Sequence, residues 1–243
     1  MIPLVFVHGF MGGSEQWYLQ RELGNNRDLI CLDFPGFGKN AHLPAIDKIE
    51  DFADWALQEL TRQGIKNFHL LGHSMGGMIV QSMVNKSPER VKNLILYATG
   101  FTGLFPGRFE TMETSMKRAV KDGAIDTARR ISATWFLEYD KAEHYQPCAN
   151  IATMCSLSAI LAGLKAMSIW SGEGSLAHIN APTLVIAGSK DRTYPWAQIS
   201  GLWQNIPNCD LAFLPDCAHA IHMEKPHLFN SIIDDFLKTA SSP

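Results

Sequence analysis

A serine in the first third of the chain lies among glycines in a pattern typical of a nucleophile. The pentapeptide GHSMG at 72–76 directly follows a short apolar run at 68–71 and opens a helical stretch at 75–86. Between a strand and a helix, the two glycines permit the strained turn that lifts a serine hydroxyl above a sheet edge. The helix N-terminus, with its partial positive charge, then points at the reacting carbonyl. This pattern predicts Ser74 as the nucleophile of an acyl transfer.

A serine hydroxyl needs a general base, and the base needs an acid to orient it. In sites built on such a turn, the three residues follow in the order Ser, Asp, His. Asp191 comes just after the apolar run 183–187, and His219 comes just after the run 211–214. Each therefore stands past the C-terminal end of an expected strand, at the same edge as Ser74. We expect the three residues to form a catalytic triad.

Other histidines and acids near these motifs have competing interpretations. His73 adjoins the nucleophile, so its side chain should point away, and we interpret it as structural. His222 lies three residues past His219 and could line a substrate pocket. Asp216 has the position of a turn residue, and Asp33 opens the glycine-rich turn DFPGFG.

An acyl-transfer site also needs donors for the developing oxyanion. One donor is the backbone N–H of the residue after the nucleophile, here Met75, and the second comes from the loop after an early strand. That loop is HGFMGG at 8–13, in which Phe10 is the natural donor. A phosphate-binding loop is the alternative, but no Lys-Ser/Thr follows and no acidic residue completes a dinucleotide fingerprint.

The elements that must position these residues alternate along the chain. Strands are expected at 4–7, 29–32, 68–71, 94–97, 183–187 and 211–214, and helices at 47–63, 75–86, after Pro195 and at 226–237. Strands that are apolar on both faces and separated by helices indicate an α/β fold, with a mostly parallel sheet flanked by helices.

The alternation stops between residues 101 and 178. This segment is helical in pattern, rich in Met and Trp, and too long for a connecting loop. We expect a helical cap (lid) inserted into a core made of 1–100 and 179–243. Trp135 and Trp170 of the cap, together with His222, are candidates for substrate binding.

Basic residues outnumber acidic ones in part of the expected cap. The basic residues are Arg108, Lys117, Arg118, Lys121, Arg129 and Arg130, against four Asp/Glu. This excess hints at docking of an acidic acyl carrier, but a solvated helix face is the preferred interpretation.

The composition limits the partners. The chain has 243 residues, 46% of them hydrophobic, and a net charge of −3 without a long run of one sign. We therefore expect no nucleic-acid groove and no membrane-binding tail. The uncharged stretch 148–164 is interrupted by polar residues and is shorter than the about 20 residues of a spanning helix, so we expect no membrane span.

The sequence shows no metal-ligand motif, no cysteine pair and no secretion signal, and these absences bear on the expected cofactors and compartment. No histidine and acid cluster has metal-ligand spacing, so we predict no metal and no cofactor. The five cysteines form no CxxC pair and are interpreted as reduced thiols, and no secretion signal is visible before the first strand. The cysteines and the lack of a visible signal predict a cytoplasmic protein, and the acyl-transfer motifs predict a small-molecule substrate.

With these motifs placed, the chain resembles the α/β-hydrolase superfamily over essentially its whole length. The matching segments are HGF, DFPGFG, GHSMGG, GSKD and AHAIHMEKP. It is most similar to the small capped carboxylesterases, a group that includes the pimeloyl-ester methyl esterases of biotin synthesis. The resemblance implies a nucleophile at Ser74, an acid at Asp191, a base at His219, and oxyanion amides at Phe10 and Met75.

Departures from related groups narrow the expected reaction. Many members carry two further strands before the HG loop, whereas this sequence begins at the strand of that loop. We therefore expect a shorter sheet edge, which leaves the oligomeric state open. Carbon–carbon hydrolases of the meta-cleavage type often have Asn in place of His73, and menaquinone-pathway relatives have Arg in place of Met78. Haloalkane dehalogenases and epoxide hydrolases use Asp in place of Ser74.

By elimination we expect hydrolysis of carboxylic esters with small to medium acyl chains, through an acyl-enzyme on Ser74. Two alternatives stay open. One is a carbon–carbon bond hydrolase that acts on vinylogous diketones with the same triad. The other is a ligand-sensing protein that turns over slowly.

Overall fold

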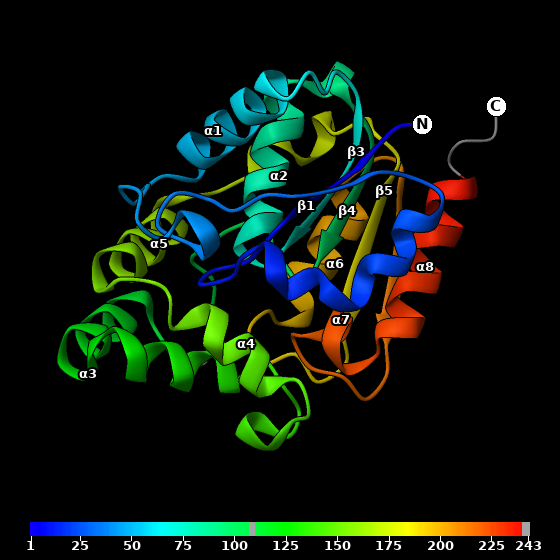
Figure 1. Ribbon diagram of the computed structural model, residues 1–243. Helices are drawn as coiled ribbons and strands as arrows, with labels where there is room; N and C mark the ends of the chain where they lie inside the picture. Colours follow the sequence, from blue (N-terminus) through cyan, green and yellow to red (C-terminus); the bar gives the residue numbers. More distant parts are fainter. Residues whose placement is uncertain (107–109, 240–243) are drawn as a thin grey trace.

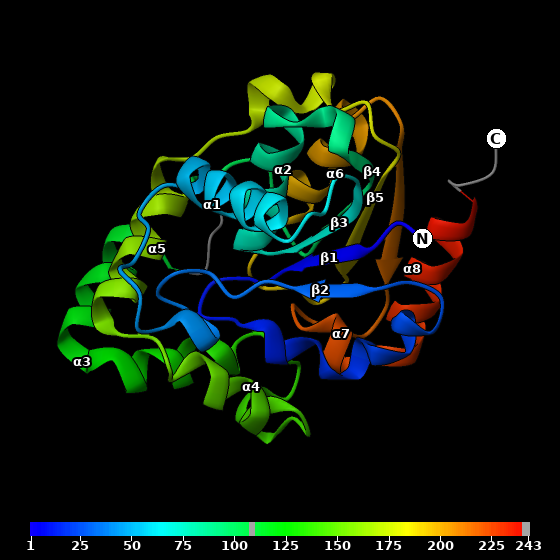
Figure 2. The ribbon, with the colours of Figure 1, turned by 45° about the horizontal axis from the view of Figure 1, so that its top comes forward.

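A computed structural model describes residues 1–106 and 110–239. Within these residues, six parallel strands form one sheet in the order β2-β1-β3-β4-β5-β6 (Figures 1 and 2). The strands are β1 Leu4–Val7, β2 Leu29–Cys31, β3 Phe68–His73, β4 Val91–Tyr97, β5 Thr183–Gly188 and β6 Cys209–Leu214. The expected α/β class, a parallel sheet flanked by helices, is confirmed.

The four central strands of the sheet, β1, β3, β4 and β5, are buried on both faces and are apolar at most positions, whereas the edge strands β2 and β6 are half-buried. Side chains of β1 alternate between the faces. Val5 and Val7 belong to one core cluster, which includes apolar residues of three flanking helices, and Leu4 and Phe6 belong to a second cluster on the opposite face. The ladder hydrogen bonds set the register of neighbouring strands, and burial of the central strands protects these bonds from water.

Helices cover the two faces. The α-helices are α1 Ile49–Arg62, α2 Met75–Lys86, α3 Met112–Ala133, α4 Tyr145–Ala152, α5 Leu157–Ile169, α6 Trp196–Asn205, α7 Ile221–Glu224 and α8 Pro226–Thr239. Helices α1, α2 and α6 contribute to the first core cluster. Helix α8 and the 3₁₀ segment Ser14–Asn25 contribute to the second.

A helical region lies between β4 and β5, at one end of the sheet in Figure 1. Its entry and exit lie side by side, since Thr102 and Ser171 form an isolated antiparallel bridge. Helix α3 begins at a cap in which Thr111 accepts a hydrogen bond from the Thr114 amide, and it is interrupted at Gly123, whose φ is 81°. Helix α5 begins at a similar cap on Ser156.

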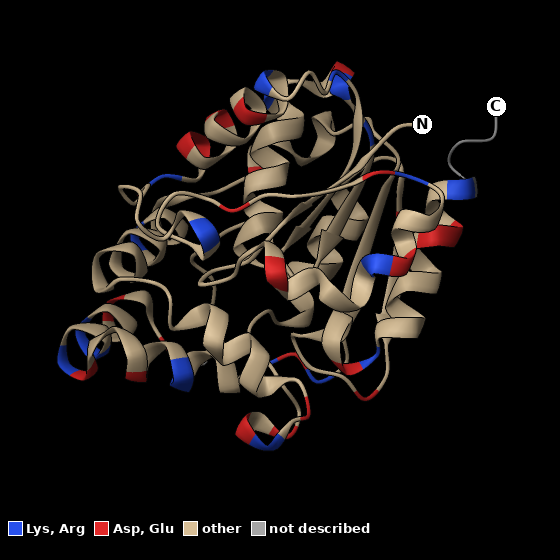
Figure 3. Cartoon of the chain, viewed as in Figure 1, with Lys and Arg blue, Asp and Glu red and all other residues tan. Residues whose placement is uncertain are grey.

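The charges of α3 are largely matched within the helical region. Figure 3 shows basic and acidic residues interspersed along it. Arg118 and Arg130 both pair with Glu110, and Lys117 pairs with Glu113. Arg108, one of the basic residues noted in the sequence, lies outside the described residues.

Among the described residues, no single helix is long and apolar enough to cross a membrane. One pair of helices, α4 with α5, meets the length and composition criteria together, but the two are bent by 97° at the break between them.

Candidate active site

Ser74 occupies a strained turn between β3 and α2. Its φ of 56° and ψ of −118° lie in a region that non-glycine residues rarely adopt, at a cost of about 1–3 kcal/mol. The turn is held on both sides, because the Ser74 amide donates to Tyr97 O (2.9 Å) and Ser74 O accepts from Thr99 Oγ1 (2.7 Å) and from the Gly77 amide (2.8 Å).

The glycines on either side of the serine are required sterically. A Cβ on Gly72 would collide with the Gly76 carbonyl, and one on Gly76 would collide with the Val7 carbonyl. The backbone of α2 therefore packs directly against β3 and the end of β1. This close approach fixes the direction in which Ser74 leaves the sheet.

Asp191 and His219 lie in direct contact on two neighbouring loops. Asp191 follows β5 and His219 follows β6, and His219 Nδ1 is 2.9 Å from Asp191 Oδ2. Both side chains are almost fully buried, with 1% of His219 and 3% of Asp191 exposed. The other carboxylate oxygen, Oδ1, accepts a hydrogen bond from the Thr193 amide (2.7 Å). Nδ1 of the histidine is thus turned to the carboxylate, which leaves Nε2 available to a nucleophile.

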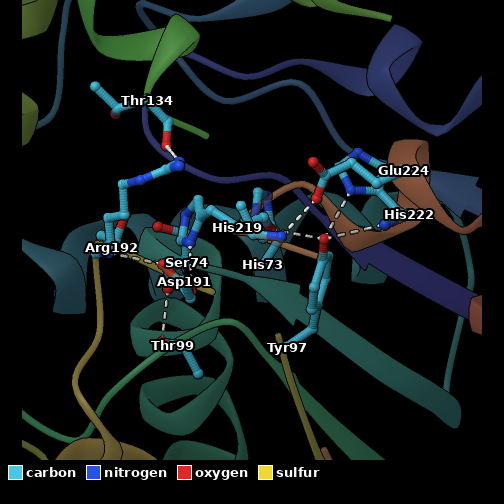
Figure 4. Close-up of polar contacts among 12 residues, drawn as sticks. His73, Ser74, Tyr97, Thr99, Thr134, Asp191, Arg192, His219, His222 and Glu224 are labelled. Carbon is cyan, nitrogen blue, oxygen red and sulfur yellow. Dashed lines mark hydrogen bonds and ion pairs between the residues drawn. The ribbon is translucent and has the colours of Figure 1, made fainter. Parts of the chain in front are cut away.

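The three predicted triad residues follow three strands of one parallel sheet and share its C-terminal edge (Figure 4). A cavity of about 30 Å³ adjoins Ser74 and is walled in part by Trp135, whose ring centroid is 6.2 Å from that of His219. Trp135 therefore connects the cavity at the serine with the Asp191–His219 pair.

The amides of Phe10 and Met75 are available as donors. Met75 is the first residue of α2, and Phe10 follows β1 in a turn closed by the Gly12 amide on Gly9 O (3.0 Å). Within the described part of the chain, neither amide donates a hydrogen bond to another group.

His8 orders the loop that carries Phe10, and sequence reasoning did not single it out. Its Nε2 accepts a hydrogen bond from the Phe34 amide (3.2 Å), so its Nδ1 carries the proton and donates to Gly9 O (2.8 Å). Burial lowers the pKa of His8, which keeps the ring neutral.

The cavity beside Ser74 is lined both by residues of the loops at the sheet edge and by residues of the helical region between β4 and β5. The lining residues are Phe10, Ser74, Ser115, Ile131, Trp135, Leu164, Met167, Thr193 and Tyr194. Of these, the sequence singled out Trp135 as a pocket residue. Leu164 was missed, and Met167 was not distinguished from the other methionines of the segment, because an apolar residue on a helix packed on both sides gives no sign of which side it faces.

Two further pocket candidates lie away from this cavity. The Trp170 indole packs against α2 and its Nε1 donates to Ser82 Oγ (3.2 Å). His222 lies behind the site, with its ring centroid 4.9 Å from that of Trp17 and its Nδ1 2.9 Å from Tyr97 Oη. Neither residue is among those lining the cavity at Ser74.

Buried histidines pack behind the Ser74 turn. The His73 ring stacks on Tyr97, with centroids 4.5 Å apart. Burial, followed by the nearby His219 and His222, holds the pKa of His73 well below its usual value. Burial likewise lowers the pKa of His222 to about 3. Both rings therefore stay neutral near pH 7 and have a packing role.

The alternative acids have structural contacts. Asp33 Oδ1 accepts from the Ser14 amide (2.8 Å), and its carbonyl accepts from Asn40 Nδ2 (2.6 Å). Asp216 is an exposed turn residue with a φ of 48°. The acid in contact with His219 is Asp191.

Comparison with known proteins decides the family. Residues 2–226 match the family model described as alpha/beta hydrolase fold. The chain belongs to the α/β-hydrolase family. It is thus a hydrolase, in which the strained turn, the acid and the histidine follow β3, β5 and β6 in turn.

Relatives of this α/β-hydrolase differ in their named reactions. The chain is 23% identical to a putative carbamate hydrolase, RutD, of Agrobacterium fabrum, over 98% of this chain and 94% of that protein. It is 24% identical to 2-hydroxy-6-oxononadienedioate/2-hydroxy-6-oxononatrienedioate hydrolase 2 of Pseudomonas putida, over 97% and 87%. Among solved structures, a thermophilic esterase from Thermogutta terrifontis superimposes with a TM-score of 0.87 at 24% identity, over 100% of this chain and 91% of that one. At this identity the structural likeness shows the shared fold.

Proposed function

We propose that this α/β-hydrolase cleaves carboxylic esters of small to medium acyl chains through an acyl-enzyme on Ser74. The observation that carries the proposal is the buried 2.9 Å contact between His219 and Asp191, at the sheet edge where the Ser74 turn is strained. A buried carboxylate on Nδ1 fixes the imidazole tautomer and stabilises the imidazolium that forms during the reaction.

The mechanism has two half-reactions. Ser74 Oγ attacks the ester carbonyl while His219 Nε2 takes its proton. The tetrahedral intermediate then collapses, its C–O bond breaks, and the leaving oxygen takes the proton from His219 and departs as the alcohol. Water, activated by the same histidine, then attacks the acyl-enzyme and releases the acid. Asp191 stays ionised throughout.

The oxyanion of each tetrahedral intermediate would be held by the amides of Phe10 and Met75. Donors that are already oriented stabilise developing charge without reorganisation, and the loss of one such donor costs about 10²–10³ in rate in a serine protease. The hydrogen bonds of His8 order one of these donors, and the N-terminus of α2 presents the other.

We propose that residues 101–178 act as the cap over this site. Five of the nine residues that line the cavity come from this segment. A cavity of about 30 Å³ is large enough for about two water molecules. An acyl chain longer than acetyl can therefore bind only if the cap moves away from the site.

A carbon–carbon hydrolase is the second candidate, favoured by the similarity to the Pseudomonas putida dienedioate hydrolase. The same triad would then act on a vinylogous diketone. The two functions are separated by steady-state turnover of purified protein on nitrophenyl esters and on vinylogous diketones, with Ser74→Ala as the control. The proposal predicts Ser74-dependent turnover of the esters, with diketones poor. If the protein turns over diketones but not esters, it is a carbon–carbon hydrolase and the ester-hydrolase proposal is wrong.

A further inference from the structure

The segment that follows α3 lies against both catalytic loops. The Trp135 carbonyl accepts two hydrogen bonds, from the amides of His219 (3.0 Å) and Ala220 (2.9 Å). The Trp135 side chain lines the cavity at Ser74. One residue of the helical region therefore both supports the histidine loop and forms the pocket wall.

Arg192 ties the same segment to the loop of the acid. It directly follows Asp191, and its Nη1 donates to Phe136 O (2.9 Å) while its Nη2 donates to Leu137 O (3.2 Å). Its guanidinium also lies over the ring of Tyr139, 4.4 Å from the centroid. Figure 4 shows Arg192 reaching from the side of Asp191 toward Thr134, whose carbonyl accepts from Nη1 at 3.5 Å. Hydrogen bonds from a guanidinium are charge-assisted and stronger than neutral ones.

Glu224 makes the matching connection on the side of the base. Its Oε1 accepts from the Leu137 amide (2.7 Å), and its Oε2 accepts from the Ala218 amide (2.6 Å). One carboxylate thus joins the segment after α3 to the residue that precedes His219. Arg192 and Glu224 therefore bind the two sides of the Phe136–Leu137 peptide group, its carbonyl and its amide. Arg192 reaches it from the loop after β5, and Glu224 from the end of α7.

We propose that Arg192 and Glu224 are positioning residues that clamp residues 134–139 onto the loops of Asp191 and His219. Neither side chain lines the cavity at Ser74, so neither acts on substrate directly. The clamp fixes Trp135, and through its carbonyl the backbone of His219, relative to the acid. Opening of the cap must then occur away from this segment, on the side of α5. This inference rests on the proposed roles of Asp191 and His219.

The test compares Arg192→Ala, Arg192→Lys and Glu224→Gln with Lys190→Ala. Lys190 is the matched control, because it is an exposed cation on the other side of Asp191. The first readout is the second-order rate of Ser74 labelling by a fluorophosphonate, which depends on no particular substrate. The second is hydrogen exchange of the peptide that carries the amides of residues 218–220.

Arg192→Ala and Glu224→Gln should each label at least about ten-fold more slowly, since small displacements of catalytic groups can cost up to about 10²-fold. Exchange of the 218–220 amides should be at least about ten-fold faster in both variants, because charge-assisted hydrogen bonds no longer hold the segment whose Trp135 carbonyl accepts from the amides of 219 and 220. Arg192→Lys should show smaller changes in both rates than Arg192→Ala. In Lys190→Ala, the labelling and exchange rates should stay within about two-fold of the wild type, as expected for an exposed side chain.

Three outcomes would overturn the clamp. They are unchanged labelling in both Arg192→Ala and Glu224→Gln, unchanged exchange at 218–220 in both, and an equal loss in Lys190→Ala. If Arg192→Ala does not fold, Glu224→Gln decides alone. A wild-type protein that does not label at all would refute the nucleophile, and hence the proposed function, while the exchange measurement would still decide the clamp.

Discussion

Because the cavity at Ser74 is small, the preferred length of the substrate's acyl chain should depend on one side chain of α5. Met167 is 3% exposed and lines the cavity. Replacing it with Ala removes three heavy atoms, which exceeds the two methylenes that separate a butyryl from a hexanoyl group. Each methylene that becomes buried contributes about 0.8 kcal/mol, or about four-fold in kcat/KM, so two contribute about 15-fold.

For the wild-type protein we expect kcat/KM to rise from acetyl toward butyryl or hexanoyl esters and to fall for longer chains. In Met167→Ala, the ratio of kcat/KM for hexanoyl over butyryl nitrophenyl ester should rise by up to about 15-fold, because two methylenes find room. The assay is steady-state hydrolysis of a series of straight-chain esters.

Met83→Ala is the matched control. Met83 is fully buried on α2 and does not line the cavity, so the same substitution there should cost comparable stability, about 2–5 kcal/mol. Its hexanoyl-to-butyryl ratio should stay at the wild-type value. An unchanged ratio in Met167→Ala, or an equal rise in Met83→Ala, would refute the assignment of the cavity as the acyl pocket.

Two further predictions concern the acid and the buried histidines. Asp191→Asn should keep the fold but favour the wrong imidazole tautomer and lower kcat by about 10⁴-fold, whereas Asp216→Asn should keep near wild-type rates; kinetics that reverse this order would identify Asp216 as the acid. The pKa of His222, lowered to about 3 by burial, lies below its unfolded value of about 6.5, so the unfolded chain binds the extra proton first as pH falls. The free energy of unfolding should therefore be unaffected by His222 above about pH 6.5, and this residue should lower it by about 2 kcal/mol between pH 7 and pH 5. Urea unfolding at the two pH values measures it, and equal stability would contradict the buried neutral ring.

The strands could be predicted from the sequence because burial on both faces leaves a continuous apolar run. The centres of all six were placed correctly, and the errors lie at the ends. Strand β3 continues through Gly72 and His73, and β4 begins at Val91, before Lys92 and Asn93. At these positions backbone pairing extends the strand although the side chains are polar or absent.

Contacts between distant segments could not be predicted. Tyr97 ends β4 as an apolar strand residue, yet its hydroxyl lies within 2.9 Å of both the His219 carbonyl and His222 Nδ1. Arg192 and Glu224 likewise resemble ordinary surface charges in sequence. Both bind backbone groups at 134–137, more than 50 residues away, and backbone groups carry no sequence signal.

The most direct test of the proposed mechanism is the site of fluorophosphonate labelling. The strained turn and the buried Asp191–His219 pair predict that the probe modifies Ser74 and no other serine, as located by peptide mass spectrometry, and that Ser74→Ala loses both labelling and ester turnover. Retained turnover in Ser74→Ala, or labelling of another residue in the wild type, would contradict the assignment of Ser74 as the nucleophile.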